Sequence, residues 1–285
     1  MTESYRTSDA ESMYLDLMKK VLTRTDLDHT YRVLHTRVGT FRKVFNPLAL
    51  KILDAFNLEL RRRVDREVRL RGGDWPSEAE TMIGLARLTN LQACLTDVLD
   101  NGVPGDVIET GVWRGGATIF MRAVLKVRNV TDRMVWVADS FQGLPKPDAS
   151  RYPVDAGDVH WTNHALAVSV DEVMGNFKKY DLLDEQVRFL VGWFRDTLPS
   201  APIDQLSVMR LDGDMYESTI VALEALYPRL SCGGYAIIDD YGAVSSCRRA
   251  VHDYRDRHKV MDEMKEIDWS GVFWQKTSQG SGDEM

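Results

Sequence analysis

The sequence has few cysteines, no long apolar run and no excess of positive charge. Its three cysteines, Cys94, Cys232 and Cys247, are widely spaced and form no C-x-x-C pair, which argues against a disulfide framework or a zinc cluster. No apolar run approaches the roughly 18 residues that a membrane helix needs. Residues 1–10 are polar and lack the basic-then-apolar pattern of a secretory signal. We therefore predict a soluble, cytoplasmic protein with reduced thiols.

Charge and composition narrow the range of partners. The 36 basic and 43 acidic residues give a formal net charge of −7, which argues against nucleic acid or an anionic membrane as a general partner. A small-molecule partner is favoured instead. With 285 residues, 44% of them hydrophobic, the chain can bury a sizeable core. Its length predicts one α/β domain with an appendage.

Residues 1–73 are predicted to form a helical extension that serves in oligomerisation or as a lid. Arginines between Arg61 and Arg71 are expected on a solvated or subunit-facing surface. Further along, Ser77 and Glu80 have the spacing of a capping box, which predicts a helix that reaches about Leu99. Two apolar stripes at helical spacing support the extension: Tyr14, Leu17, Met18, Val21 and Leu22, then Leu53, Phe56, Leu60, Val64 and Val68.

Beyond residue 100, short β-rich runs alternate with helical stretches. This alternation is typical of a mostly parallel sheet with helices on both faces, here spanning residues 74–276. Residues 271–275 are predicted to add a last strand, antiparallel and at or near an edge. The tail, 277–285, is rich in Ser, Gly and acidic residues and is expected to be disordered. The predicted strands of the parallel sheet are Asp106–Thr110, Met134–Asp139, Val187–Val191, Leu206–Asp212 and Tyr235–Asp239.

The first strand end predicts a cofactor site, because ligands of open α/β sheets bind at the carboxyl ends of the strands. The turn Glu109-Thr110-Gly111-Val112-Trp113-Arg114-Gly115-Gly116 has Trp113 where a dinucleotide fingerprint has its second glycine. Glu109 suits an ammonium group, and Asp139, after the second strand, suits the two hydroxyls of a ribose. An amino acid joined to adenosine is S-adenosylmethionine. The alternative is that both carboxylates merely cap nearby backbone donors.

The third strand end offers a wall for the adenine. Gly192-Trp193-Phe194 follows the run Val187–Val191 and would place an indole beside the cofactor. Trp193 and Phe194 are equally compatible with a place in the hydrophobic core.

Two further strand ends bring four carboxylates to one rim of the sheet. Crowded carboxylates need a cation or a proton, and an all-oxygen ligand set suits Mg²⁺. Asp212, Asp239 and Asp240 are the predicted metal ligands. Asp214 is either a general base or, with Glu217, a helix-capping residue. Asp239 and Asp240 are alternatively turn residues before a glycine.

Hydrolase and dehydrogenase chemistry finds little support. The segment Ala149–Ala165, with His160 and His164, is predicted either to close over an acceptor or to be a simple loop. The G-x-S-x-G elbow of Ser–His–Asp hydrolases is missing. No Tyr is followed by Lys four positions later, as short-chain dehydrogenases require.

Across residues 74–276 the sequence strongly resembles the macrocin O-methyltransferase family. The resemblance lies in long, specific runs: Asp74-Trp75-Pro76, Thr81-Met82-Ile83-Gly84, residues 102–116, Val137-Ala138-Asp139-Ser140-Phe141-Gln142-Gly143-Leu144-Pro145, and Leu211-Asp212-Gly213-Asp214-Met215-Tyr216-Glu217-Ser218-Thr219. It implies a Rossmann-like class I methyltransferase fold and Mg²⁺-dependent transfer of a methyl group from S-adenosylmethionine. It also implies a homodimer or a higher homo-oligomer.

The resemblance assigns roles to individual residues. The implied cofactor residues are Glu109, Gly111, Asp139 and Ser140, with Thr81, Met82 and Trp193 beside them. The implied metal ligands are Asp212, Asp239 and Asp240, and Asp214 matches the family's base. This chain departs from the family in having Glu80 where a histidine is expected, and in a long entry segment, His29–Gly72.

We therefore expect an O-methyltransferase that acts on a deoxysugar hydroxyl of a glycosylated natural product. A phenol or catechol acceptor is an alternative, because a metal needs only two suitably placed oxygens. Two competing hypotheses are a nucleotide-dependent oxidoreductase and a non-catalytic scaffold that keeps the cofactor pocket.

Overall fold

The computed structural model describes residues 9–33, 52–53, 55–58 and 60–277. Within this part of the chain a seven-stranded sheet has the order β5-β4-β3-β6-β7-β9-β8. The first five of these strands are parallel, and β9 runs antiparallel to β7, which confirms the predicted sheet. Its strands are β3 (Asp106–Thr110), β4 (Val135–Asp139), β5 (Val187–Val191), β6 (Leu206–Leu211), β7 (Leu230–Ile238), β8 (Lys265–Glu266) and β9 (Val272–Gln275).

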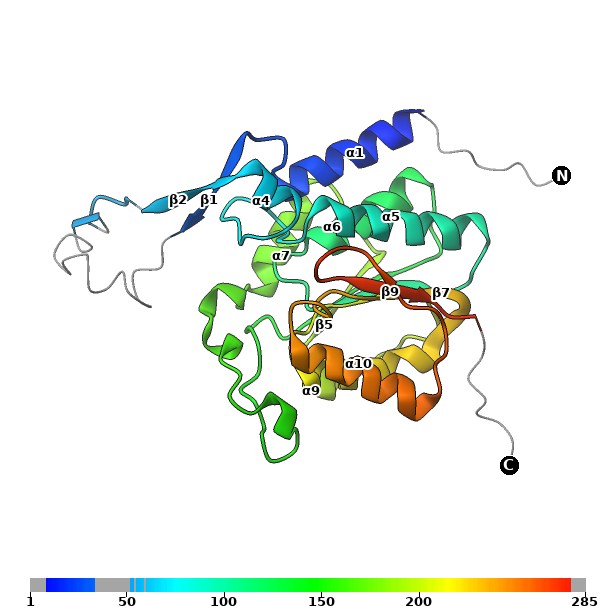
Figure 1. Cartoon of the computed structure of the whole chain (residues 1–285). Coiled ribbons are helices and arrows are strands. Elements are labelled where there is room, and N and C mark those ends of the chain that lie inside the picture. Colours follow the sequence, from blue (N-terminus) through cyan, green and yellow to red (C-terminus); the bar gives the residue numbers. More distant parts are fainter. Residues whose placement is uncertain (1–8, 34–51, 54, 59, 278–285) are drawn as a thin grey trace, which may run out of the picture.

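Helices cover both faces of this sheet (Figure 1). The helices α1, α5 and α6 lie on one face, and α9 and α10 lie together on the other. The larger helices are α1 (Asp9–Thr23), α5 (Leu85–Asp100), α6 (Gly116–Val127), α7 (Val170–Lys179), α9 (Tyr216–Leu226) and α10 (Ser245–His258). Helix α8 (Phe194–Thr197) and the 3₁₀ turns found among the described residues are short.

Alternation along the strands sends side chains into two separate cores. In β4, Val135 and Val137 join the core beneath α5 and α6, whereas Trp136 and Ala138 join the core beneath α9 and α10. Successive strand residues point to opposite faces, so a run that is apolar throughout is buried on both sides. This is why the strand sequences read as continuous apolar runs rather than as alternating ones.

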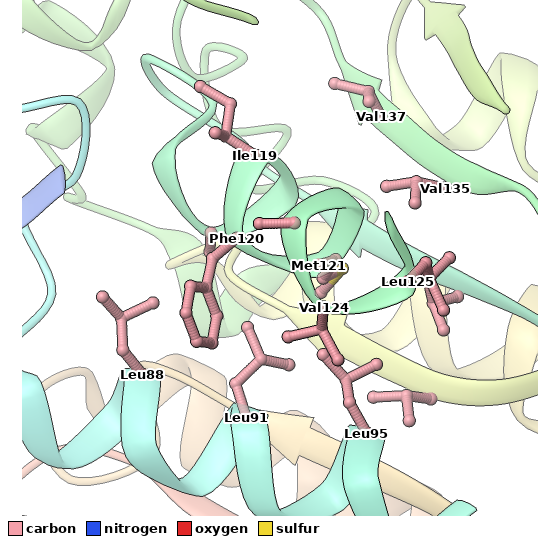
Figure 2. Close-up of a cluster of buried hydrophobic side chains, with 14 of the residues drawn as sticks. Leu88, Leu91, Leu95, Ile119, Phe120, Met121, Val124, Leu125, Val135 and Val137 are labelled. Carbon is pink, nitrogen blue, oxygen red and sulfur yellow. The ribbon is translucent and has the colours of Figure 1, made fainter. Parts of the chain in front are cut away.

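The first core is formed by helix packing against helix. Leu88, Leu91 and Leu95, at spacings of three and four, point from α5 toward Phe120 and Val124 of α6 (Figure 2). All five side chains are completely buried. Burying one such side chain contributes about 1.5–3 kcal/mol. The glycine-rich turn that leads into α6 is thereby fixed against the sheet.

The N-terminal segment is only partly helical. α1 is as predicted, and its Leu15 and Leu22 are buried in the same core as α5 and α6. The prediction of a second helix from Leu53 to Val68 is wrong: residues 61–65 form β2 (Arg61–Asp65), paired antiparallel with β1 (His29–Val33). Among the described residues of that stretch, Leu53 and Ala55 are helical before β2, and α4 (Arg66–Leu70) is helical after it. Strand pairing has overridden a helical pattern.

One arginine of this region is buried, contrary to the predicted solvated face. Arg69 is fully buried and donates to Asp74 at 2.7 Å and to the carbonyls of Met82 and Ile83 at 2.5 and 2.7 Å. It therefore fixes residues 74–83 in an extended path. The domain boundary at residue 73 stays a prediction, and residues 34–51 of the long entry segment lie outside the described part.

The predicted capping box at Ser77 is also wrong. α5 begins at Leu85, after Gly84 in an extended conformation. The Ser77 hydroxyl donates to the Tyr31 carbonyl at 2.8 Å, and the Glu80 carboxylate, which is buried, pairs with Arg24 at 3.3 Å and Lys179 at 3.6 Å. The helix begins late because the carbonyls before it are bound by Arg69. Among the described residues, no helix is long and apolar enough to cross a membrane.

Candidate active site

A cavity of about 290 Å³ opens where the strands of the parallel sheet end. Register explains what meets there: Glu109 of β3 lies opposite Arg210 of β6, and Arg210 lies opposite Ile237 of β7. Of the predicted site residues, Thr110 and Gly192 lie outside the lining of this cavity. Those that line it are Thr81, Met82, Glu109, Gly111, Asp139, Ser140, Trp193, Asp212, Asp214, Asp239 and Asp240.

The glycine-rich turn forms one wall of the cavity. Gly111 has φ of +81°, and a Cβ on it would lie 1.6 Å from the carbonyl oxygen of Asp212. A Cβ on Gly116 would likewise lie 2.6 Å from the carbonyl oxygen of Glu80. Only glycine fits such close approaches of backbone to backbone. The turn is therefore shaped by packing between strands as well as by any ligand.

Asp139 holds this turn in place. Its two carboxylate oxygens accept N–H bonds from Val112 and from Phe141, each at 2.8 Å. Burial raises the pKa of Asp139, and these backbone bonds oppose the rise. The capping alternative is therefore present in the structure. The Ser140 hydroxyl also lies 3.4 Å from Oδ1, but its one proton makes the shorter bond to the Gly143 carbonyl at 2.7 Å. Each Asp139 oxygen therefore keeps an acceptor position for a ligand hydroxyl.

Glu109 is buried beneath the turn and has one oxygen without a partner. Its Oε1 accepts from Arg210 Nη1 at 2.5 Å, while its Oε2 is buried and accepts no hydrogen bond from the residues that the structure describes. Burial raises the pKa of Glu109 to about 8. An unsatisfied buried carboxylate oxygen is costly, and a bound donor group would satisfy it.

Arg210 links both halves of the site, and sequence reasoning did not identify it. Its guanidinium is fully buried and pairs with Glu109, with Asp212 at 3.0 Å, and with Asp239. Asp239 also accepts from Arg87 at 2.5 Å, which in turn contacts Asp268 at 3.0 Å. The available signal was a charged residue in the buried run Leu206–Leu211, where Ser207 is the one other polar residue.

The tightest acidic cluster is Asp212, Asp214 and Asp240. One carboxylate oxygen from each lies within 4.8 Å of the others. The predicted metal set had Asp239 in place of Asp214, but in the structure Asp239 is engaged by the two arginines. The neighbourhood thus holds four aspartates, of which these three lie closest together.

Burial and mutual repulsion both act on this acidic cluster. Burial, then the nearby charge of Asp239, raises the pKa of Asp212 to about 6. Burial, then the charge of Asp212, raises the pKa of Asp214 to about 7. The pKa of Asp240 is also raised well above its ordinary value by burial and then by Asp214. Such an arrangement favours a proton or a cation among the three carboxylates.

The prediction that Asp214 caps the following helix is wrong. α9 begins at Tyr216, and its first N–H groups donate to another side chain, Asp155. Asp214 instead has φ of +55°, and its own N–H donates to Asp240 Oδ2 at 3.0 Å. Glu217, the expected partner in that capping motif, pairs with Arg195 at 3.0 Å. The Asp214 carboxylate is therefore left to face the cavity.

The cavity is also lined by residues that the sequence analysis did not identify. Arg87 and Trp269 come from α5 and from the loop before β9, and the Arg87 guanidinium lies 5.7 Å from the Trp269 ring centre. His160, expected either over an acceptor or in a simple loop, lines the cavity while its Nδ1 contacts Asp158 at 2.8 Å. His164 is not among the lining residues.

Comparison with known proteins identifies this architecture. A family model described as Macrocin-O-methyltransferase matches residues 11–276. A Streptomyces olivaceus protein, 8-demethyl-8-(2,3-dimethoxy-alpha-L-rhamnosyl)-tetracenomycin-C 4'-O-methyltransferase, is 53% identical over 273 residues, covering 95% of each chain. Demethyldecarbamoylnovobiocin O-methyltransferase of Streptomyces niveus is 50% identical over 278 residues, covering 95% of this chain and 96% of its own.

A solved structure agrees with both relatives. The structure of the O-methyltransferase NovP superposes with a TM-score of 0.80 at 49% identity, covering 94% of this chain and 99% of that one. The predicted Rossmann-like methyltransferase fold is thereby confirmed. Membership of a methyltransferase family also excludes the hypothesis of a nucleotide-dependent oxidoreductase. The chain belongs to the macrocin O-methyltransferase family, and it is a methyltransferase.

Proposed function

We propose that this protein transfers a methyl group from S-adenosylmethionine to a deoxysugar hydroxyl of a glycosylated natural product, with Mg²⁺ required. The observation that carries the proposal is one cavity lined by two chemically different groups of side chains. Glu109 and Asp139, from the ends of β3 and β4, form what we call its cofactor side, and the cluster Asp212, Asp214 and Asp240, from the ends of β6 and β7, forms its acidic side. A methyl donor and an acceptor hydroxyl have to meet in such a shared cavity.

The cofactor side supplies binding groups for each part of S-adenosylmethionine. We assign the ribose hydroxyls to Asp139, whose oxygens keep free acceptor positions, and the amino group to the unpaired Oε2 of Glu109. Trp193 lines the cavity and provides an aromatic surface for the adenine. Thr81, Met82, Gly111 and Ser140 complete the cofactor wall. Thr110 and Gly192 support it through the backbone at the ends of β3 and β5.

The acidic cluster fits Mg²⁺ by its donor chemistry. It offers carboxylate oxygens and neither His nor Cys, which suits a hard cation bound octahedrally. We assign Asp212 and Asp240 as ligands, because both are predicted from their positions in the sequence and both belong to the acidic cluster of the structure. We assign the third position to Asp239, as the family pattern implies, with Arg87 and Arg210 orienting it. When bound, Mg²⁺ would hold acceptor oxygens and lower the pKa of a hydroxyl.

Asp214 is then free to act as the general base. The pKa of Asp214 is about 7. A general base works best when its pKa lies near the working pH, because it is then largely deprotonated and still binds a proton well. The Asp214 carboxylate would take the hydroxyl proton as the acceptor oxygen attacks the sulfonium methyl group. Holding the two reactants in line supplies much of the rate, since the sulfonium is already a reactive methyl donor.

Relatives support a sugar hydroxyl as the acceptor. The Streptomyces olivaceus protein is named for methylation of a rhamnosyl tetracenomycin, and Mycinamicin III 3''-O-methyltransferase of Micromonospora griseorubida is 55% identical over 215 residues. A phenol or catechol acceptor is the competing outcome. The predicted homo-oligomer and the cytoplasmic location stay predictions; light scattering tests the first.

Two measurements test the proposal. Calorimetric titration of chelator-treated protein with S-adenosylhomocysteine should show binding with or without Mg²⁺. Mass spectrometry should then show Mg²⁺-dependent methylation of an O-rhamnosylated aromatic polyketide but not of its aglycone or of a simple catechol. Methylation of the catechol alone would overturn the sugar assignment, and turnover that survives chelation would overturn the metal requirement.

A further inference from the structure

The start of α9 is capped by a residue from a distant loop. Asp155 Oδ1 accepts the N–H of Tyr216 at 2.8 Å, and its Oδ2 accepts the N–H of Glu217 at 2.9 Å. The first N–H groups of a helix have no partner within the helix, so a carboxylate there satisfies them and also favours the helix dipole. Asp155 is only 2% exposed, so these bonds form away from water.

The capped helix end is part of the acidic side of the cavity. Asp214 lies two residues before Tyr216 in a left-handed conformation, held by its N–H bond to Asp240. Next to it, Gly213 packs so closely that a Cβ on it would lie 2.8 Å from the Cβ of Ser218 in α9. A shift at the start of α9 would therefore move Asp214 relative to the rest of the cluster.

Asp155 belongs to a loop that reaches both sides of the cavity. This site loop, residues 149–167, hangs below the sheet between β4 and α7 (Figure 1). At its far end, the Trp113 indole N–H of the glycine-rich turn donates to the Ala165 carbonyl at 2.9 Å. Between these two attachments, His160 lines the cavity, and so does Leu166 just beyond them. The loop is thus tied to the cofactor side by Trp113 and to the acidic side by Asp155.

We propose that Asp155 is a positioning residue for methyl transfer, because it fixes the site loop and the Asp214 backbone in one arrangement around the acceptor. This inference rests on the proposed function in one respect only, namely that the acidic side receives the acceptor. Loss of the cap leaves two buried N–H groups without a partner and removes the hydrogen bonds that join the loop to α9. The Tyr152 ring, 6.0 Å from the Tyr216 ring, then remains as a contact between the loop and α9. Acceptor binding and turnover then suffer, whereas the cofactor side, built on β3 and β4, does not.

The test compares Asp155→Ala with a matched control near the same loop. Asp148→Ala is the control, because Asp148 accepts backbone N–H bonds from Ser150 and Arg151 nearby in the chain and bonds nothing more distant among the described residues. For Asp155→Ala we expect kcat to fall about tenfold and the acceptor KM to rise several-fold, the scale of a lost helix cap. Affinity for S-adenosylhomocysteine should change less than about twofold, well below that scale. Asp148→Ala should match the wild type in kcat, in acceptor KM and in affinity for S-adenosylhomocysteine.

Limited trypsin digestion reads the loop directly and needs no acceptor. Arg151 is followed by Tyr152, whereas Lys146 is followed by Pro147 and resists trypsin, so a first cut after Arg151 reports opening of the loop. We expect Asp155→Ala to be cut there about ten times faster than the wild type, on the scale of a lost cap. If no acceptor is methylated, the proposed function is overturned. The rate of cleavage after Arg151 still shows whether Asp155 holds the site loop in place.

A conservative variant separates positioning from mere stability. Asp155→Asn keeps one acceptor oxygen and should give intermediate cleavage and kcat; it also serves if Asp155→Ala does not fold. Equal cleavage after Arg151 in both Asp155 variants and the wild type would overturn the proposal. So would a lowered melting temperature with kcat and acceptor KM unchanged, because that is what a purely structural cap predicts.

Discussion

The two sides of the cavity are built in different ways. On the cofactor side, Asp139 is held by the N–H groups of the turn beside it, and Glu109 is the one residue of that pair held by a distant group, Arg210. On the acidic side, the arrangement depends on groups far along the chain: Arg87 is 152 residues from Asp239, and Asp155 is 61 residues from Tyr216.

The two sides differ in how the burial of their carboxylates is compensated. The cofactor side satisfies Asp139 with backbone donors, which are present wherever the strands end. The acidic side has more carboxylates than nearby cations, and burial raises the pKa values of Asp212 and Asp214. A cation or a proton has to complete that side, whereas the turn around Asp139 is complete in the folded chain. The sides should therefore respond differently to substitution, chelation and pH.

Asp212→Ala should have the largest effect on turnover. It removes a proposed metal ligand and one group of the acidic cluster, so kcat should fall about 10³-fold, comparable to loss of an electrostatic catalytic group. Affinity for S-adenosylhomocysteine, measured by calorimetry, should stay within about twofold, well short of that loss. Asp204→Ala, at an exposed position, is the control. Retained turnover would show that Asp212 is no part of the reaction.

Arg210→Met tests the residue that joins the two sides. It leaves Glu109 and Asp239 buried without this guanidinium, and breaking a buried ion pair costs about 3–5 kcal/mol. Urea unfolding should show that loss in the free energy of unfolding. Adding Glu109→Gln should recover part of it, because a neutral amide is buried without first taking up a proton. An unchanged unfolding midpoint in the single variant would contradict the role of Arg210.

Asp139→Ala should weaken cofactor binding, whereas Asp212→Ala should lower kcat and leave cofactor binding unchanged. Loss of its hydrogen bonds to a ribose and to the turn should weaken binding of S-adenosylhomocysteine by about 2–3 kcal/mol, roughly 30- to 150-fold. Mg²⁺ binding, measured by calorimetry on the same variant, should be unaffected. If the variant binds S-adenosylhomocysteine as tightly as the wild type, Asp139 does not bind the ribose hydroxyls.

Stability without metal should fall as pH rises. In the folded protein the pKa of Asp212 is about 6 and that of Asp214 about 7, against an ordinary value of 3.8, so both groups keep protons that the unfolded chain has already lost. The free energy of unfolding is therefore highest below about pH 4 for these groups and declines until about pH 7. With chelator present we expect these two groups to lower the free energy of unfolding by about 4 kcal/mol between pH 5 and pH 8, measured by urea unfolding.

Mg²⁺ should reverse this trend. The ion binds the deprotonated carboxylates, so it should stabilise the protein more at pH 8 than at pH 5. Asp214→Asn, which removes one titrating group, should flatten the profile in chelator. A stability that rises with pH in chelator would contradict the proposed burial of these charges.

Several expectations failed where a distant group competed with a local pattern. Ser77 and Glu80 have capping-box spacing, but Arg69 binds the carbonyls of Met82 and Ile83, and the helix begins later. Asp214 and Glu217 have the same kind of spacing, yet Asp155 takes the helix N–H groups. Local spacing shows which hydrogen bonds a side chain could form. Which of them it does form depends on the donors and acceptors that the fold brings close to it.

The sequence by itself determined the sheet, the glycine-rich turn and the carboxylates at the strand ends. Apolar runs of strand length are buried on both faces, and the ends of parallel strands meet at one edge whatever the details of packing. Tertiary structure alone decided which carboxylates are paired with arginine and which are left together. Two of those pairings, Arg210 with Glu109 and Arg87 with Asp239, join residues more than a hundred positions apart, and no local pattern specifies them.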